Sequence, residues 1–256
     1  MKELRLDHAA CTSGLLDHLT LPTCTEVMLK GVFTGEEFDD RGDPAAQLRP
    51  SSINHLPVTR RITKAVAIPH SCILSGPNGN IRFWCFEETR ARFGAEFFTS
   101  FSPISVLEIR HLWVGQHSTS RSGIRHTFPE QTVVDIRNTF RVLAKVEDLT
   151  LVSCKTAAFF STLGVAADDE VLLPGLRRLT IFVGCEYLDV SAFIQCLKAR
   201  KEQSRSLCEV TVVFEKEPEA DLVEAMESLG EFVEELVYRV GEAPKLFWLD
   251  EDCDDW

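Results

Sequence analysis

Apolar side chains recur at a fixed spacing along this chain. Residues 146–154, VEDLTLVSC, place them at Val146, Leu149 and Leu151, and Cys154 follows three residues later. Four other segments repeat the spacing: Ile104/Leu107/Ile109, Leu176/Leu179/Ile181, Leu207/Val210/Val212 and Val233/Leu236/Tyr238. A spacing that returns every 20 to 50 residues or so indicates that one structural unit is stacked several times.

The pattern LxxLxLxxC is typical of a leucine-rich repeat, in which each unit supplies a strand and a helix or helical turn. The second apolar position of successive strands recurs after about 23 to 42 residues, at Leu4, Val27, Val66, Leu107, Leu149, Leu179, Val210 and Leu236. We therefore expect an α/β fold in which residues 1–256 form one irregular leucine-rich-repeat-like solenoid domain. A curved parallel sheet would line its concave side and helices its convex side.

Four apolar stripes at helical spacing predict the helices of these units. Their members are Val133/Ile136/Phe140/Leu143, Phe159/Phe160/Leu163, Val190/Phe193/Ile194/Leu197 and Leu222/Met226/Leu229/Val233. Asp189 or Ser191 can cap the start of the third helix.

Alternating strands and helices also suit a doubly wound nucleotide-binding sheet. Strands covered by helices on both faces are apolar nearly throughout. Here the positions between the apolar strand residues are polar, at Arg5, Glu108, Thr150, Thr180 and Thr211, and no GxGxxG or Walker-type loop follows a strand. The pattern therefore favours a solenoid with one wet face.

Two segments lack the repeat pattern. Residues 31–61 contain GEEFDDRGDP and several further prolines and serines, so we expect a long irregular surface insertion with one short helical turn. Residues 250–256 are acidic and predict a flexible tail. Because the chain opens on a repeat strand without a cap, we expect either another segment to cover it or a longer parent protein.

The net charge of -12 is unevenly distributed, since residues 209–256 hold sixteen Asp/Glu and three Lys/Arg. No basic face suggests nucleic-acid binding. No apolar run approaches the roughly 18 residues of a membrane span, and charges interrupt the start, where a signal peptide would be apolar. We therefore expect no membrane binding and a cytoplasmic or nuclear location.

The nine cysteines form no CxxC pair and lack histidines at zinc spacing. We interpret them as small buried hydrophobic residues and expect no metal and no cofactor. A polar loop at residues 115–130 carries His117, Arg121, Arg125 and His126; it is either an anion or acidic-peptide site or an ordinary solvated loop.

Residues 176–217, LRRLTIFVGCEYLDVSAFIQCLKARKEQSRSLCEVTVVFEKE, resemble the C-terminal repeats of mushroom (basidiomycete) F-box and leucine-rich-repeat-like proteins. The resemblance extends over residues 100–256. It implies a substrate-recognition part of an F-box-type ubiquitin-ligase receptor, in which an N-terminal F-box binds an Skp-type adaptor and the repeats hold substrate. No F-box is visible here, so adaptor binding does not carry over.

The leading hypothesis is a protein-interaction module that binds an unknown protein on the concave face. Parallel strands align equivalent residues about 5 Å apart. Thr150, Thr180 and Thr211 would form one row, and Val152, Phe182 and Val213 an exposed apolar row beside it. Alternatively, Phe182 turns toward a segment that covers it. A third row, Asp148, Arg178 and Glu209, predicts a stabilising surface ladder of alternating charge.

Two other interpretations remain. Histidines 111, 117 and 126 with Cys154 or Cys185 are raw material for an enzyme, but no GxSxG or HExxH motif joins them, so we expect no catalytic residues. The chain could also be a truncated repeat fragment without an independent role.

Overall fold

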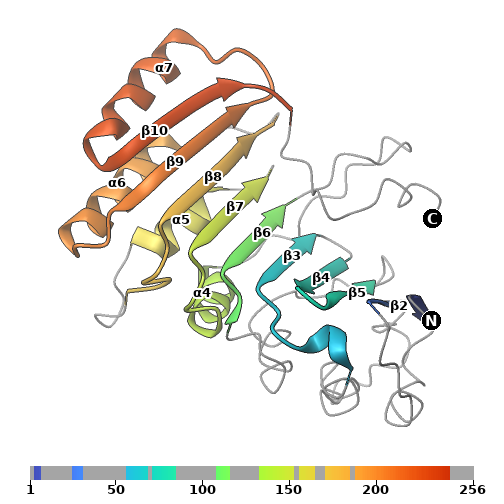
Figure 1. Cartoon of the computed structure of the whole chain (residues 1–256). Coiled ribbons are helices and arrows are strands. Elements are labelled where there is room, and N and C mark those ends of the chain that lie inside the picture. Colours follow the sequence, from blue (N-terminus) through green and yellow to red (C-terminus); the bar gives the residue numbers. More distant parts are fainter. Residues whose placement is uncertain are drawn as a thin grey trace. The chain divides into compact units, whose positions relative to one another are not determined.

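A computed structural model describes residues 3–6, 25–30, 56–68, 71–84, 108–115, 133–152, 156–164, 171–184 and 188–242. Within these ranges the fold is mixed α/β, with ten strands, mostly parallel in their pairing, and four α-helices (Figure 1). The expected α/β class is therefore confirmed. The chain divides into two compact units, Met1–Leu112 with Val134–Val146, and Trp113–Val133 with Glu147–Trp256. The single solenoid domain stays a prediction.

Five strands of the first unit are neighbours in the order β1-β2-β5-β4-β3. They are β1 (Glu3–Leu6), β2 (Glu26–Lys30), β3 (Lys64–Ile68), β4 (Ser71–Gly76) and β5 (Gly79–Trp84). β1 and β2 pair in parallel, as do β2 and β5, whereas β3, β4 and β5 run antiparallel. Helix α4 (Val133–Val142) lies almost wholly in this unit, and β6 (His111–Gly115) contains the division.

The β4–β5 hairpin departs from the repeat pattern. The repeat pattern does not predict β4. Gly79 begins β5 with a φ of +129°, and a Cβ there would lie 1.8 Å from the Thr25 carbonyl oxygen. The next residue, Asn80, donates its N–H to that oxygen at 2.8 Å. Glycine is therefore required for β5 to pair closely with β2.

The predicted insertion at residues 31–61 is described only from Leu56 onward. A 3-10 helix at Pro57–Thr59 matches the expected short helical turn. Leu56 and Val58 are fully buried, however, so this end of the segment belongs to the core and the surface prediction is wrong there. Residues 31–55 and the predicted tail at 250–256 lie outside the described ranges.

The second unit contains four parallel strands in the order β7-β8-β9-β10. They are β7 (Asp148–Val152), β8 (Arg178–Val183), β9 (Leu207–Phe214) and β10 (Val233–Val240). Their register pairs Leu149 with Leu179, Leu179 with Val210, and Val210 with Leu236. This confirms the last three repeat intervals predicted from the sequence.

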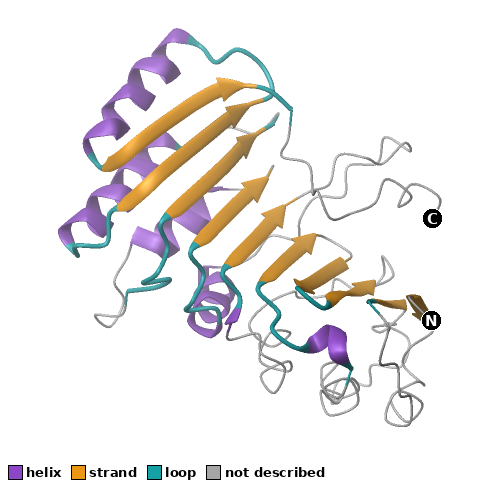
Figure 2. Cartoon of the chain, viewed as in Figure 1, coloured by secondary structure: helices purple, strands orange, loops and turns teal. Residues whose placement is uncertain are grey.

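Helices cover one side of these four strands (Figure 2). They are α5 (Thr156–Gly164), α6 (Val190–Glu202) and α7 (Ala220–Glu227), the last continued by a 3-10 turn at Ser228–Glu231. Asp189 caps α6 as predicted, because its Oδ1 accepts the N–H of Ala192 at 2.9 Å. Phe160 on α5 and Phe193 on α6 stack with ring centroids 4.5 Å apart, which fixes the two helices against each other.

A double hydrogen bond recurs where successive strands begin. The carbonyl oxygen of Glu147 accepts the N–H groups of Arg177 and Arg178, and the Arg177 carbonyl accepts those of Cys208 and Glu209. In the first unit, the Thr63 carbonyl accepts two N–H groups in the same way, from Arg110 and His111. The residues just before these acceptors are buried: Ile62, Val146 and Leu176.

This recurrence corrects the repeat frame at β6. The sequence assigned Ile104, Leu107 and Ile109 to the three apolar positions. The strand is instead His111–Gly115, and the buried residues at LxxLxL spacing are Ile109, Leu112 and Val114. Ile109 fits the last position of one frame and the first position of the other, so spacing alone could not separate them. In β3, likewise, the frame is Ile62/Ala65/Ala67 rather than one centred on Val66.

Candidate interaction surface

The side of β7, β8 and β9 that faces away from the helices carries a row of threonines. Thr150 pairs with Thr180, and Thr180 with Thr211, so the three side chains lie side by side on adjacent strands. All three are half-buried, whereas Leu149 and Leu151, which alternate with Thr150, are buried. Because strand residues alternate between faces, the hydroxyls occupy the face opposite the helices. The predicted threonine row is confirmed.

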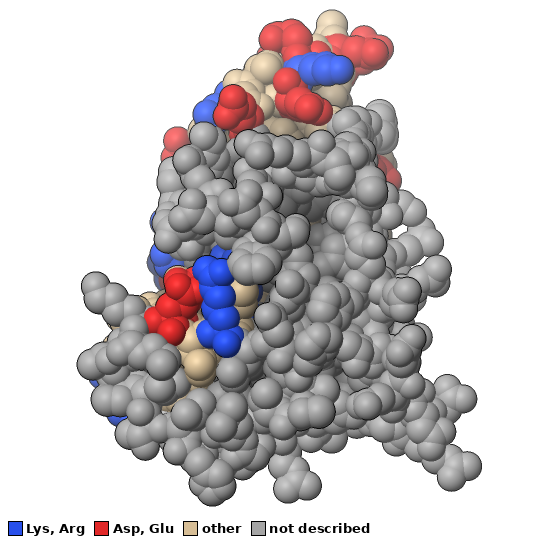
Figure 3. Space-filling view, turned by 90° about the vertical axis from the view of Figure 1, so that its right-hand side faces the viewer, with Lys and Arg blue, Asp and Glu red and all other residues tan. Residues whose placement is uncertain are grey.

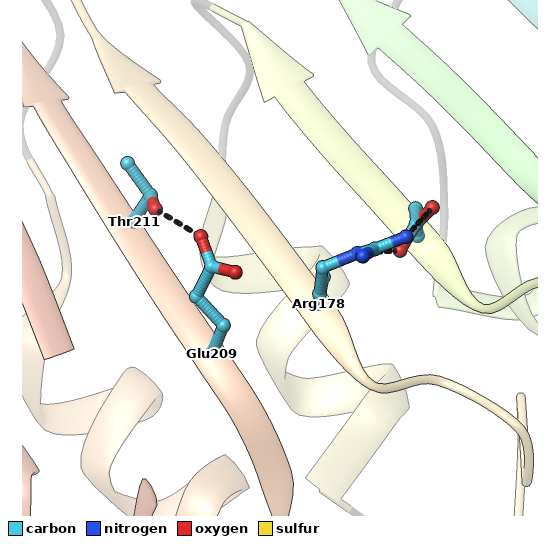
Figure 4. A network of polar contacts seen from close by, with 4 residues as sticks. Arg178, Glu209 and Thr211 are labelled. Atoms are coloured by element: carbon cyan, nitrogen blue, oxygen red, sulfur yellow. Dashed lines mark hydrogen bonds and ion pairs between the residues drawn. The ribbon is translucent and has the colours of Figure 1, made fainter. Parts of the chain in front are cut away.

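A charged row lies next to the threonines, nearer the start of each strand (Figure 4). Asp148, Arg178 and Glu209 pair in succession, and Glu235 on β10 continues the row. Arg178 donates from Nε to Asp148 Oδ1 and from Nη2 to Asp148 Oδ2, the second at 2.7 Å. The hydrogen bond and negative charge of Asp148 raise the pKa of Arg178.

The charged row is connected to the threonine row through Glu209. Thr211 donates its hydroxyl to Glu209 Oε1 at 3.1 Å (Figure 4). Because the Arg178 side chain is 56% exposed, its ion pair with Asp148 stabilises the fold by only about 0.2–1 kcal/mol. The predicted surface ladder of alternating charge is confirmed, and its groups remain accessible for hydrogen bonds to another molecule.

The predicted apolar row is formed, but it is not exposed. Val152, Phe182 and Val213 pair in succession, and their exposed fractions are 1%, 7% and 1%. At these carboxyl ends of the strands, consecutive residues are buried: Leu151 with Val152, Ile181 with Phe182, and Val212 with Val213. Consecutive buried residues point to opposite faces, so both faces are covered there. The expectation of an exposed row is wrong, and the burial of Phe182 agrees with the alternative that it is covered.

The amino-terminal halves of the strands therefore form the wet surface. We call the six side chains that define it the polar strand face: Asp148, Thr150, Arg178, Thr180, Glu209 and Thr211. Hydroxyl groups both donate and accept, a carboxylate accepts, and the guanidinium has further N–H groups beyond those bound to Asp148. This set can hydrogen-bond to the backbone and polar side chains of another protein.

The groups considered for catalysis are not brought together by the described residues. His111 lies half-buried on β6, while His117, His126, Cys154 and Cys185 lie outside the described ranges, as does nearly all of the polar loop at 115–130. Among the described side chains, no group of three or more His, Cys, Asp or Glu could hold a metal ion.

The described cysteines include two that are buried, Cys72 and Cys196. Burial raises the pKa of the Cys196 thiol to about 12, which makes it a poor nucleophile at neutral pH. For these two residues the interpretation as small buried hydrophobic side chains is confirmed.

Comparison of the chain with protein-family models finds no match, and comparison with curated proteins finds none either. The resemblance to F-box and leucine-rich-repeat-like proteins thus stays a prediction. Among the described helices, none combines the length and apolar character needed to traverse a lipid bilayer.

Proposed function

We propose that this chain is a protein-interaction module with a leucine-rich-repeat-like solenoid arrangement, and that its polar strand face binds a partner protein. The observation that carries the proposal is the threonine row. Three identical, half-buried hydroxyl groups lie in register on the strand face opposite the helices, beside a row of charges in which Arg178 bonds to Asp148. Small polar side chains repeated on a flat strand surface can contact a partner without a cavity.

The rigidity of this face favours binding. Its side chains stand on paired strands with the buried α5 and α6 behind them, and Arg178 and Thr211 are already held by hydrogen bonds. Binding therefore orders few additional rotamers, which lowers the entropic cost of association. Val152, Phe182 and Val213 contribute differently from what the sequence suggested: they support the strands from within the core.

A finer proposal concerns the partner. The resemblance of residues 176–217 to F-box and leucine-rich-repeat-like proteins supports a role as the substrate-recognition part of an F-box-type ubiquitin-ligase receptor in the cytoplasm or nucleus. Affinity purification of the full chain tests this role. Recovery of an Skp-type adaptor would support it, whereas partners without the adaptor would favour a stand-alone interaction module.

The proposed face is tested by comparing partners of matched variants. Thr180→Arg/Thr211→Arg places two bulky cations on the polar strand face. Ser191→Arg/Gln195→Arg places the same two cations on an exposed side of α6. Quantitative mass spectrometry of proteins that co-purify with the full chain should show loss of the partner in the first variant and retention in the second. If the threonine variant is folded and keeps every partner, the polar strand face is not the binding surface.

A further inference from the structure

Strand β10 ends the sheet of the second unit in a way that suits it for pairing. Among the strands that the structure describes, β10 pairs with β9 alone (Figure 1). The N–H of Gly241, just after β10, donates to the carbonyl oxygen of Phe214 on β9 at 2.9 Å. In a parallel ladder only alternate residues direct their N–H and C=O toward a given neighbour. Those of Leu236, Tyr238 and Val240 consequently point to the outer edge.

The same residues expose apolar side chains. Among the described residues, the large hydrophobic side chains that are exposed are Tyr238, at 39%, and Val240, at 46%. Their register partners on β9, Val212 and Phe214, are buried. The side chains of Val212 and Phe214 on β9 are therefore covered, whereas those of Tyr238 and Val240 on β10 are covered only in part. Unpaired backbone groups next to exposed apolar side chains are the features by which a sheet edge accepts another strand.

Charge limits what can pair there. Residues 209–242 contain eleven Asp/Glu and only two Lys/Arg, and ten of the eleven are exposed. Four of the exposed acids lie in β10 or within two residues of it: Glu231, Glu234, Glu235 and Glu242. Figure 3 shows acidic side chains clustered at the end of the molecule where Figure 1 places α7. A second copy of this chain would bring the same negative charge to the edge, whereas a basic segment would be attracted.

We propose that β10 accepts, as an added strand, an extended basic segment of a partner protein in which Lys or Arg alternates with apolar residues. The backbone of the segment would bond to the outward N–H and C=O groups of Leu236, Tyr238 and Val240. Its apolar residues would cover Tyr238 and Val240, and its basic residues, on the opposite face of the added strand, would lie near Glu235. This surface uses none of the threonines of the polar strand face, so the proposal stands independently of the proposed function.

A fluorescent peptide of alternating lysine and valine is the probe, titrated with the full chain and followed by fluorescence polarisation. The unmodified peptide should bind, and a version N-methylated at alternate residues should bind about fivefold more weakly or worse, because it lacks the donors for the edge. A glutamate–valine peptide should not bind. Equal affinity for the N-methylated and unmodified peptides would overturn the proposal, because charge alone would then explain binding.

Variants of the protein show where the lysine–valine peptide binds. Tyr238→Pro removes an outward N–H and leaves the ladder to β9 intact, so it should weaken binding about fivefold or more, while Tyr238→Phe should bind like the wild type. Glu235→Lys should weaken binding more than Glu202→Lys, which changes an exposed acid on α6. If Tyr238→Pro does not fold, the proposal is still tested by comparing the affinities of the unmodified and the N-methylated lysine–valine peptides for the wild-type chain.

Two further outcomes would contradict the proposal. Thr180→Val/Thr211→Val should leave peptide affinity unchanged, and loss of binding in this variant would place the peptide on the polar strand face. Sedimentation should show no self-association through the edge. Concentration-dependent dimers that Tyr238→Pro abolishes, with no affinity for the lysine–valine peptide, would mean that a second copy occupies β10.

Discussion

Arg200 on α6 donates from Nη2 to the carbonyl oxygen of Leu173 at 3.1 Å, and from Nη1 to that of Leu172 at 3.0 Å. The arginine is only 1% exposed, and its burial lowers the pKa of the guanidinium. Leu173 has a φ of +47°, in the left-handed region that leucine seldom adopts. A buried cation thus holds an unusual turn in the connection before β8, and links α6 to the segment that leads into the strand carrying Arg178 and Thr180.

Replacing this arginine should destabilise the second unit. Arg200→Met fills similar volume but removes the guanidinium donors of the Leu172 and Leu173 carbonyls, of which the second keeps the N–H of Leu176, and we expect a loss of about 2–4 kcal/mol. Arg205→Met, at an exposed position, should change stability by less than about 0.5 kcal/mol. Urea unfolding followed by circular dichroism measures both. Equal stability of the two variants would show that the buried guanidinium is not needed.

Close packing of α5 on α6 makes a second prediction. A Cβ on Gly164 would lie 2.7 Å from the Cα of Cys196, so the helix backbones must separate. Gly164→Ala should therefore cost about 1–3 kcal/mol despite the better helix propensity of alanine. Gly230→Ala is the matched control, because nothing lies within 4 Å of its added Cβ, and it should be neutral or stabilising by less than about 1 kcal/mol. Denaturation midpoints compare them.

The Cys196 thiol should resist alkylation in the folded chain. With a pKa raised to about 12 by burial, only about one molecule in ten thousand carries the thiolate at pH 8. Brief treatment with iodoacetamide at pH 8, followed by peptide mass spectrometry, should label the half-buried Cys208 well before Cys196. In urea both should be labelled at similar rates. Equal labelling without denaturant would contradict the buried position of Cys196.

The ion pair between Glu108 and Lys145 makes a prediction about pH. The hydrogen bond and the positive charge of Lys145 lower the pKa of Glu108 from its ordinary value. A carboxyl with a lowered folded pKa contributes stability that is present above its unfolded pKa and is lost as the pH falls through its folded pKa. In an NMR titration, the Glu108 carboxyl should titrate at a lower pH in the wild type than in Lys145→Met. High salt should also raise the pKa of Glu108 in the wild type, because the ion pair is exposed and salt screens it.

Sequence periodicity predicted most of the second unit. Strands β7, β8 and β9 have both the spacing and the register that Leu149, Leu179 and Val210 predicted, and the three predicted helices follow them. The threonine row came from the same argument, because equal spacing in parallel strands aligns equivalent residues. Local patterns were sufficient here because the strand of each repeat pairs with the strand of the next repeat through equivalent positions.

Other features depended on contacts that spacing does not encode. Strand β4, with the short apolar run SCILSG, pairs antiparallel with two neighbours and follows no repeat, so the spacing of apolar residues does not predict it. Tyr238 fits the apolar pattern but is exposed, because β10 has no further strand beside it among those described. The burial of Phe182 and Val213 did have a signal: at the carboxyl ends of β8 and β9, the apolar residues are consecutive rather than alternating.

The paired N–H donations to Thr63, Glu147 and Arg177 have a consequence for how such a chain can vary. Each pair of hydrogen bonds fixes where the next strand starts relative to the previous one, whatever the length of chain between the two strands. The intervals between strands can then lengthen or shorten while the strands stay aligned. A chain whose strand starts are fixed in this way tolerates insertions in the connections between strands, and the surface that its strands display is preserved.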